Sequence, residues 1–98
     1  MANLVKDKDA KGIQVLRPTT TEAVSISGTA ASSSAVTQEV LRIVSDTDCF
    51  YSLVGTATTT TAVFLPAYVV EFVHSYSGDT VSIITSSATG TAYITEMI

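Results

Sequence analysis

The sequence predicts one all-β domain folded as an antiparallel sandwich or barrel. Serine and threonine are abundant, and valine and isoleucine recur throughout the 98 residues. Short apolar runs alternate with glycine-containing turns at a regular spacing, a pattern typical of antiparallel β folds. The length fits a single domain that buries only about 60–65% of its unfolded surface. A domain this small is often stabilised further by contacts with other subunits.

Eight runs have the composition of strands, because β-branched and aromatic residues fill them and turn residues bound them. They are residues 13–17, 23–28, 39–45, 49–54, 62–65, 69–75, 80–85 and 92–97. Gly78-Asp79 gives the clearest hairpin signal, and Gly90 marks the next one. The expected organisation is a flexible N-terminal arm over 1–12 and one β-sandwich domain over 13–98.

Residues 32–44, "SSSAVTQEVLRIV", also fit a second structure. Val36, Val40, Ile43 and Val44 recur at helical spacing, and the serine run could cap a helix. The flanking "SGTAASSS" has loop composition, and "LRIVSD" ends the segment. A short helix therefore competes with a strand here, and we expect the strand.

Charge separates the N-terminal arm from the rest of the chain. From Ile43 to Ile98 there is no lysine or arginine, and the net charge of the protein is −4. An acidic body repels phosphate backbones, so we expect no nucleic-acid partner. The arm could order by reaching across a neighbouring molecule, with a short apolar anchor and basic side chains. Its candidate contact residues are Leu4, Val5, Lys6, Lys8 and Lys11.

Two predicted strands are apolar on both faces. In residues 69–76, Val70, Phe72 and Tyr76 share one side, while Val69 and Val73 flank Glu71 on the other. Residues 49–54 show the same two-sided pattern. A sandwich in water needs one buried face per sheet, so a partner should cover the outer face, which we expect to carry Val69 and Val73.

Arg42 lies among valines in a predicted strand. Because an unpaired buried charge is costly, we expect Arg42 to pair with a carboxylate. The candidates are Glu71 or Glu39 in this chain, or an acid across an interface.

Neither a membrane segment nor a catalytic group is expected. The apolar run from Ala62 to Val70 ends at Glu71, too short to span a bilayer, and "MANLVKDKDAKG" lacks the features of a secretory signal. His74 is the only histidine, and Asp46 and Asp48 lack the further ligands of a calcium loop. We therefore expect no enzyme activity, no cofactor and no metal.

The C-terminal half resembles a family of small proteins of tailed bacteriophages and prophages, each about 100 residues long. The matching positions are Leu65, Pro66, Ala67, Glu71, Phe72, Gly78, Ile84, Gly90, Thr91, Thr95 and Glu96. Tyr68 stands where glycine is usual in that family, which places a large aromatic side chain at a surface corner.

The resemblance implies an eight-stranded, jelly-roll-like β-sandwich that is a structural part of the virion, like capsid decoration or cement proteins. Such a protein is made in the bacterial cytoplasm and binds the major capsid protein on the capsid surface as a homo-oligomer, with a trimer expected. Two alternatives stay open. One is an adaptor of the neck, tail or fibres, and the other is a lectin-like module that binds carbohydrate through Tyr68 near Glu71.

Overall fold

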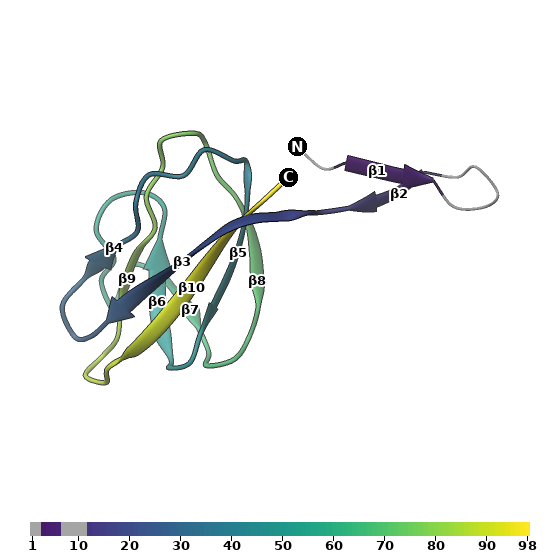
Figure 1. Ribbon diagram of the computed structural model, residues 1–98. Helices are drawn as coiled ribbons and strands as arrows, with labels where there is room; N and C mark the ends of the chain where they lie inside the picture. Colours follow the sequence, from purple (N-terminus) through teal and green to yellow (C-terminus); the bar gives the residue numbers. More distant parts are fainter. Residues whose placement is uncertain (1–2, 7–11) are drawn as a thin grey trace.

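The computed structural model describes residues 3–6 and 12–98, with side chains from residue 16 onward. In this part of the chain the backbone forms ten strands and no helix. Figure 1 shows a body of two sheets, with a two-stranded hairpin beyond one end of it. The all-β prediction is confirmed, and so is the expected strand over residues 39–45.

The body consists of two antiparallel sheets of four strands each. The first sheet has the order β3 (Pro18–Ile26), β10 (Gly90–Met97), β5 (Val40–Ser45) and β8 (Glu71–His74). The second has the order β4 (Ala31–Ser32), β9 (Ser82–Ile84), β6 (Cys49–Ser52) and β7 (Val63–Leu65). Seven of the eight predicted runs lie in these sheets. The sequence did not indicate β4, because it is two residues long and lies in a serine-rich loop.

The remaining predicted strand forms outside the body. Over residues 13–17 the observed strand is β2 (Gly12–Val15), which pairs with β1 (Asn3–Lys6) in a separate two-stranded sheet. The first strand of the body is β3, which begins at Pro18. β1 and β2 therefore pair with each other and not with the strands of the sandwich.

Strand pairing in the body is nested. β3 pairs with β10, β4 with β9, β5 with β8 and β6 with β7, each time antiparallel. The body is thus one long hairpin with its tip between β6 and β7, rolled until β10 also meets β5 and β9 also meets β6. Only the β6 to β7 connection stays within one sheet, and the other connections cross between the sheets.

This topology corrects both hairpin predictions. Gly78 has a φ of 98° and the N–H of Asp79 donates to the carbonyl of Tyr76, so the chain does turn there. However, β8 belongs to the first sheet and β9 to the second. The connection that contains Gly90 likewise leads from β9 to β10, in the other sheet. A turn signal predicts where the chain reverses, but not which strand the next segment will join.

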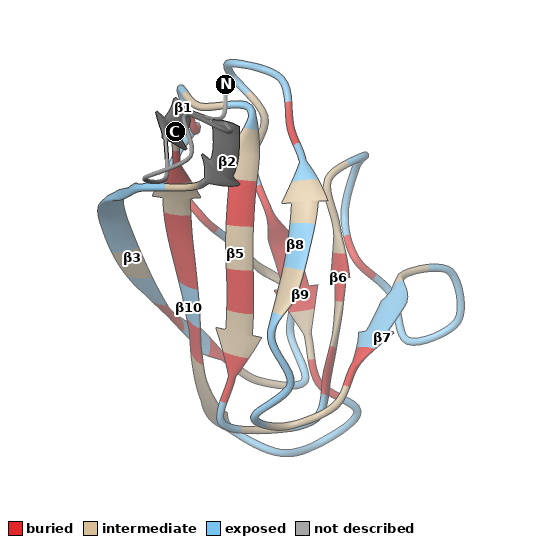
Figure 2. Ribbon diagram, turned by 90° about the vertical axis from the view of Figure 1, so that its right-hand side faces the viewer, coloured by how far each residue is buried: buried red, intermediate tan, exposed pale blue. Residues whose placement is uncertain are grey.

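The core lies between the two sheets. In β5 the side chains alternate between buried and half-buried, as the red and tan bands in Figure 2 show. Leu41 and Ile43 point inward from the first sheet and meet Cys49, Tyr51 and Ile83 from the second. Cys49 is fully buried in this core, and burial raises the pKa of its thiol.

The predicted outer face of β8 was wrong. Val73 is half-buried and packs against the core, whereas Phe72 and His74 are the residues that point outward. β8 pairs with β5 so that Val73 lies opposite the buried Leu41 and Phe72 lies opposite Arg42. Periodicity separates the two faces of a strand but does not say which one faces the core when both are apolar.

Candidate functional site

An exposed aromatic surface covers the outside of the first sheet. We call it the outer aromatic face, and its members are Val40, Arg42, Val44, Phe72, His74, Tyr76 and Tyr93. The register places Arg42 opposite Phe72, Val40 opposite His74 and Val44 opposite Tyr93. The rings of His74 and Tyr76 meet edge to face with centroids 4.9 Å apart. These contacts join three neighbouring strands into one continuous patch.

The outer aromatic face has about the area of the largest apolar patch on a typical monomer. Phe72 is 57% exposed, Tyr76 72% and Tyr93 43%. With about 200 Å² of surface for each ring, the three side chains leave about 350 Å² of mainly apolar area in water. The largest apolar patch of a typical monomer is about 300–600 Å² and is often functional. Arg and Tyr are also enriched where protein interfaces are strongest, so this composition favours a protein partner.

The second sheet is also apolar on its outside, over a smaller area. Phe50 and Phe64 lie opposite each other on β6 and β7, with ring centroids 5.3 Å apart. Phe50 is half-buried by this contact, and Phe64 is about half exposed. The prediction of strands that are apolar on both faces is therefore confirmed for both sheets.

Glu71 has a structural contact between the sheets. Its Oε1 atom accepts a hydrogen bond of 3.0 Å from the hydroxyl of Tyr51. Burial, together with the neighbouring carboxylate, raises the pKa of Tyr51 to about 12. Glu71 lies opposite the buried Ile43, so it points to the inner face while Arg42 points to the outer face. The predicted pairing of Arg42 with Glu71 is wrong for that reason, whereas a pairing with Glu39 or with an acid across an interface stays a prediction.

Tyr68 occupies a strained corner of the surface. Among the described residues, Tyr68 is the only non-glycine residue with a positive φ, which is 62°. Its side chain is 77% exposed. Its N–H donates to the carbonyl of Ser45 at 2.8 Å, and the N–H of Ala67 donates to Oδ1 of Asp48 at 2.7 Å. Tyr68 thus takes a left-handed backbone that glycine would favour. Val69 beside it is 44% exposed.

The predicted contact residues of the arm are only partly described. Leu4, Val5 and Lys6 belong to β1, where their backbones pair with β2. Lys8 and Lys11 lie outside the described residues. The prediction that the arm contacts a neighbour therefore stays a prediction.

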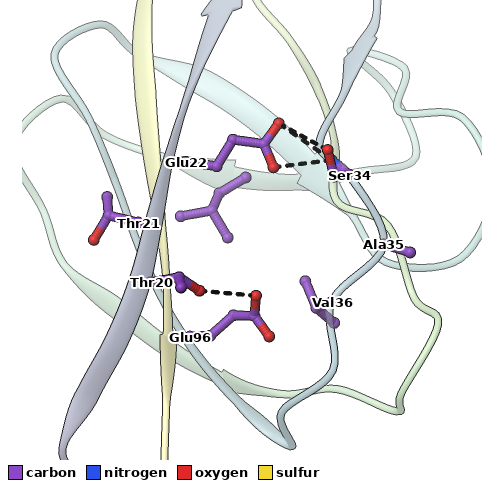
Figure 3. A pocket seen from close by; sticks show the side chains of 8 residues that line it. Thr20, Thr21, Glu22, Ser34, Ala35, Val36 and Glu96 are labelled. Carbon is purple, nitrogen blue, oxygen red and sulfur yellow. Dashed lines mark hydrogen bonds between the residues drawn. The ribbon is translucent and has the colours of Figure 1, made fainter.

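A small pocket, which we call the glutamate pocket, opens between β3, β10 and the loop that follows β4 (Figure 3). Its volume is about 140 Å³. Val36 and Ile94 are buried and give it an apolar wall, while Glu22 and Glu96 carry carboxylates into it. The full lining is Thr20, Thr21, Glu22, Ser34, Ala35, Val36, Ile94 and Glu96.

The two carboxylates of the glutamate pocket hold the loop over residues 33–38. Oε1 of Glu96 accepts from the N–H groups of Thr37 at 2.7 Å and Gln38 at 3.1 Å, and Oε2 accepts from the hydroxyl of Thr20. The bond from Thr37 is the main reason why the pKa of Glu96 is lowered. Both oxygens of Glu22 accept from the N–H of Ser34 at 3.0 and 3.2 Å.

The sequence analysis did not predict this pocket, although the sequence contains a signal for it: acidic residues in the inward-facing rows of two strands. Glu22 continues the inward row of Val24 and Ile26, and Glu96 continues the row of Ala92 and Ile94. An acid in an apolar row of a strand indicates a bound partner or an open end of the core. Glu22 and Glu96 are far apart in the sequence, so only the pairing of β3 with β10 brings them together.

No protein-family model, no curated protein and no solved structure matches this chain. Within the described residues, no helix is long and apolar enough to cross a membrane. In the same residues, His, Cys, Asp and Glu side chains do not gather into a group of three that could hold a metal ion.

Proposed function

We propose that this protein is a structural component of a bacteriophage particle that binds the head shell and stabilises it as a capsid decoration protein. It does so as a symmetric homo-oligomer, with a trimer as the expected form, on the outside of capsids assembled in the bacterial cytoplasm. The major capsid protein is its partner. The resemblance of residues 55–97 to small phage proteins supports this assignment.

The nested strand order supports the finer fold assignment, a jelly roll. A jelly roll arises when one long antiparallel hairpin is rolled so that each sheet receives alternate segments. The pairs β3·β10, β4·β9, β5·β8 and β6·β7 follow this scheme. Jelly rolls are common in viral coat proteins and also in lectins. The fold is therefore compatible with a virion role, but it does not distinguish that role from carbohydrate binding.

The outer aromatic face is the observation that carries the proposal. Its rings leave about 350 Å² of mainly apolar surface in water, which is close to half of what one partner contributes to an interface of standard size. Arg42 lies among them, opposite Phe72 and Thr95. A shell surface that brings a carboxylate to Arg42 and apolar side chains to Phe72 and Tyr93 would cover the face completely.

The test is the binding of purified protein to head shells that lack it. Phe72→Lys puts a charge beside Arg42 in the face and should weaken binding at least about tenfold, as expected for a contact that carries much of the binding energy. Thr59→Lys adds the same charge on the exposed threonine turn that connects β6 and β7 of the other sheet, and should bind like the wild type. Equal binding by Phe72→Lys and Thr59→Lys would contradict the proposal.

Two measurements address the alternatives. The copy number in purified particles, relative to the major capsid protein, separates decoration from the neck or tail: hundreds of copies fit decoration, and about a dozen fit an adaptor. A glycan array tests the lectin-like module. The lectin hypothesis relied on an exposed pair of Tyr68 and Glu71. Glu71 instead accepts a hydrogen bond from Tyr51 between the sheets and does not face outward beside Tyr68, which weakens that hypothesis.

A further inference from the structure

Tyr68 projects from one end of the sandwich, and the glutamate pocket opens at the other. Tyr68 bonds to Ser45, the last residue of β5, whereas the pocket is closed by the loop over residues 33–38, just before β5. β5 has six residues and spans about 20 Å. Tyr68 therefore cannot reach the pocket of its own chain, so a Tyr68 that enters this pocket has to come from a second molecule.

We propose that copies of this protein associate head to tail, with the phenol ring of Tyr68 from one copy inserted into the glutamate pocket of the next. This contact deepens the proposed function, because it names the self-contact of the oligomer that would sit on the shell. It leaves the outer aromatic face free for the shell. The contact is heterologous, since different surfaces meet, and it closes into a ring if the rotation between copies permits.

The size of the pocket fits one aromatic ring. Its volume is about 140 Å³, and an apolar cavity of about 150 Å³ in another protein takes up benzene. Val36 and Ile94 provide an apolar wall for the ring, and both are buried. The lining contains no Lys or Arg whose long side chain would fill the pocket.

The pocket also offers an acceptor for the phenol hydroxyl. A carboxylate has about four lone-pair sites, and the bonds that Glu22 receives come from Ser34 alone. Glu22 therefore retains capacity to accept from a phenol, whereas Glu96 already accepts four bonds. The chain uses this same chemistry internally, where the hydroxyl of Tyr51 donates to Glu71 at 3.0 Å.

The backbone prepares Tyr68 for insertion. A bulky residue at positive φ is an outlier that persists only when its surroundings fix it, and such strain is concentrated at functional positions. Here the bonds from Tyr68 to Ser45 and from Ala67 to Asp48 fix the corner. Because the backbone of Tyr68 is already fixed, insertion costs only the rotamer freedom of its side chain.

The test is sedimentation of the full chain at tens of micromolar without any phage particle. The wild type should sediment as a species larger than its 10.2 kDa monomer. Tyr68→Ala should weaken self-association at least about tenfold, as expected for a central anchor. Tyr76→Ala is the matched control, because Tyr76 is similarly exposed but belongs to the outer aromatic face. It should assemble like the wild type.

Complementation tests the head-to-tail geometry. Ala35→Trp fills the pocket but keeps Tyr68, and Tyr68→Ala keeps the pocket but lacks the ring. Each variant alone should be monomeric, while an equimolar mixture should form a heterodimer and no larger species.

Tyr68→Gly separates backbone strain from the loss of the ring. It should raise the melting temperature by a few degrees, because glycine relieves the left-handed strain, and should still abolish assembly.

Three results would overturn the inference: a monomeric wild type, self-association lost in Tyr76→Ala but kept in Tyr68→Ala, or a mixture that stays monomeric. A monomeric wild type would also contradict the oligomeric form in the proposed function, but none of the three results tests binding to the shell, which is measured separately with Phe72→Lys. Conversely, a variant that assembles normally but does not bind shells would leave the head-to-tail contact intact.

Discussion

The two ends of the sandwich use carboxylates in the same way but end up with different surfaces. At one end, Asp46 accepts from the N–H of Thr91 at 2.9 Å and Asp48 accepts from that of Ala67 at 2.7 Å. At the other end, Glu22 and Glu96 accept from the loop over residues 33–38. The aspartate end presents the exposed Tyr68, and the glutamate end encloses the pocket.

The length of the acidic side chain accounts for this difference. Aspartate has one methylene fewer, so it draws the loops at its end close together. Gly90 illustrates this, because a Cβ at that position would collide with the side chains of Thr47 and Asp46. Glutamate holds its loop farther away, and a hollow of about 140 Å³ remains beneath it. Closely packed loops can hold a strained residue in place, whereas loops held at a distance leave room for a ligand.

The largest effect should come from Gly90→Ala, which tests how tightly the aspartate end is packed. The added Cβ has no room beside Thr47 and Asp46, so we expect the free energy of unfolding to fall by about 1–3 kcal/mol. Gly28→Ala is the control, since the nearest atoms to its new Cβ would be 3.8 and 3.9 Å away. Urea unfolding measures both. If the two substitutions cost the same, the aspartate end is not closely packed.

Glu96→Gln tests the glutamate end, with a smaller and pH-dependent effect. The bond from Thr37 lowers the pKa of Glu96 below the ordinary value of 4.5. A lowered folded-state pKa means that the carboxylate stabilises the fold above about pH 4.5, and that this contribution is lost as the pH falls through the folded-state pKa. At pH 7 the substitution should cost about 1–2 kcal/mol, because the amide accepts fewer bonds.

Urea unfolding of the wild type and Glu96→Gln at pH 7 and at pH 3 measures this effect. The difference between the two proteins should shrink at pH 3, where the wild-type carboxylate is protonated more often. The pKa of Asp46 is lowered as well, chiefly by the bond from Thr91, so Asp46→Asn should show the same direction of change at the other end. A difference that is as large at pH 3 as at pH 7 would show that the charge of Glu96 does not hold the loop.

Local patterns predicted the strands well but not their partners. Alternation and turn residues located seven of the eight strands of the body, and they favoured the strand at Val40–Ser45 over a helix. The hairpins at Gly78 and Gly90 were wrong, because partner choice depends on contacts between residues far apart in sequence. The face of β8 was also wrong, because Phe72 and Val73 are equally apolar and only the pairing with β5 decides between them.

The candidate site was predictable in character but not in location. The sequence indicated that a partner must cover an apolar face, and it indicated Arg42 and Tyr68 as exceptional residues. It missed that Phe72, Tyr76 and Tyr93 form the exposed patch, because they come from strands whose order was unknown. Buried serines were likewise unpredictable. Ser33 and Ser82 accept from the N–H groups of Val81 and Ala57 on distant segments.

The smallest effect should come from Asp48→Ala, which separates the presentation of Tyr68 from the stability of the aspartate end. Oδ1 of Asp48 is the acceptor for the N–H of Ala67, one residue before Tyr68. Loss of one exposed hydrogen bond should lower the free energy of unfolding by only about 0.5–1 kcal/mol. Hydrogen exchange at the Ala67 amide should nevertheless become clearly faster, because the local turn opens without global unfolding.

Asp48→Asn is the control, because it keeps an oxygen acceptor at the same place. In this variant the exchange rate of the Ala67 amide should stay near that of the wild type. If the Ala67 amide exchanges equally slowly in Asp48→Ala, the strained corner is held by the bond from Tyr68 to Ser45, and the carboxylate contributes nothing to how Tyr68 is displayed.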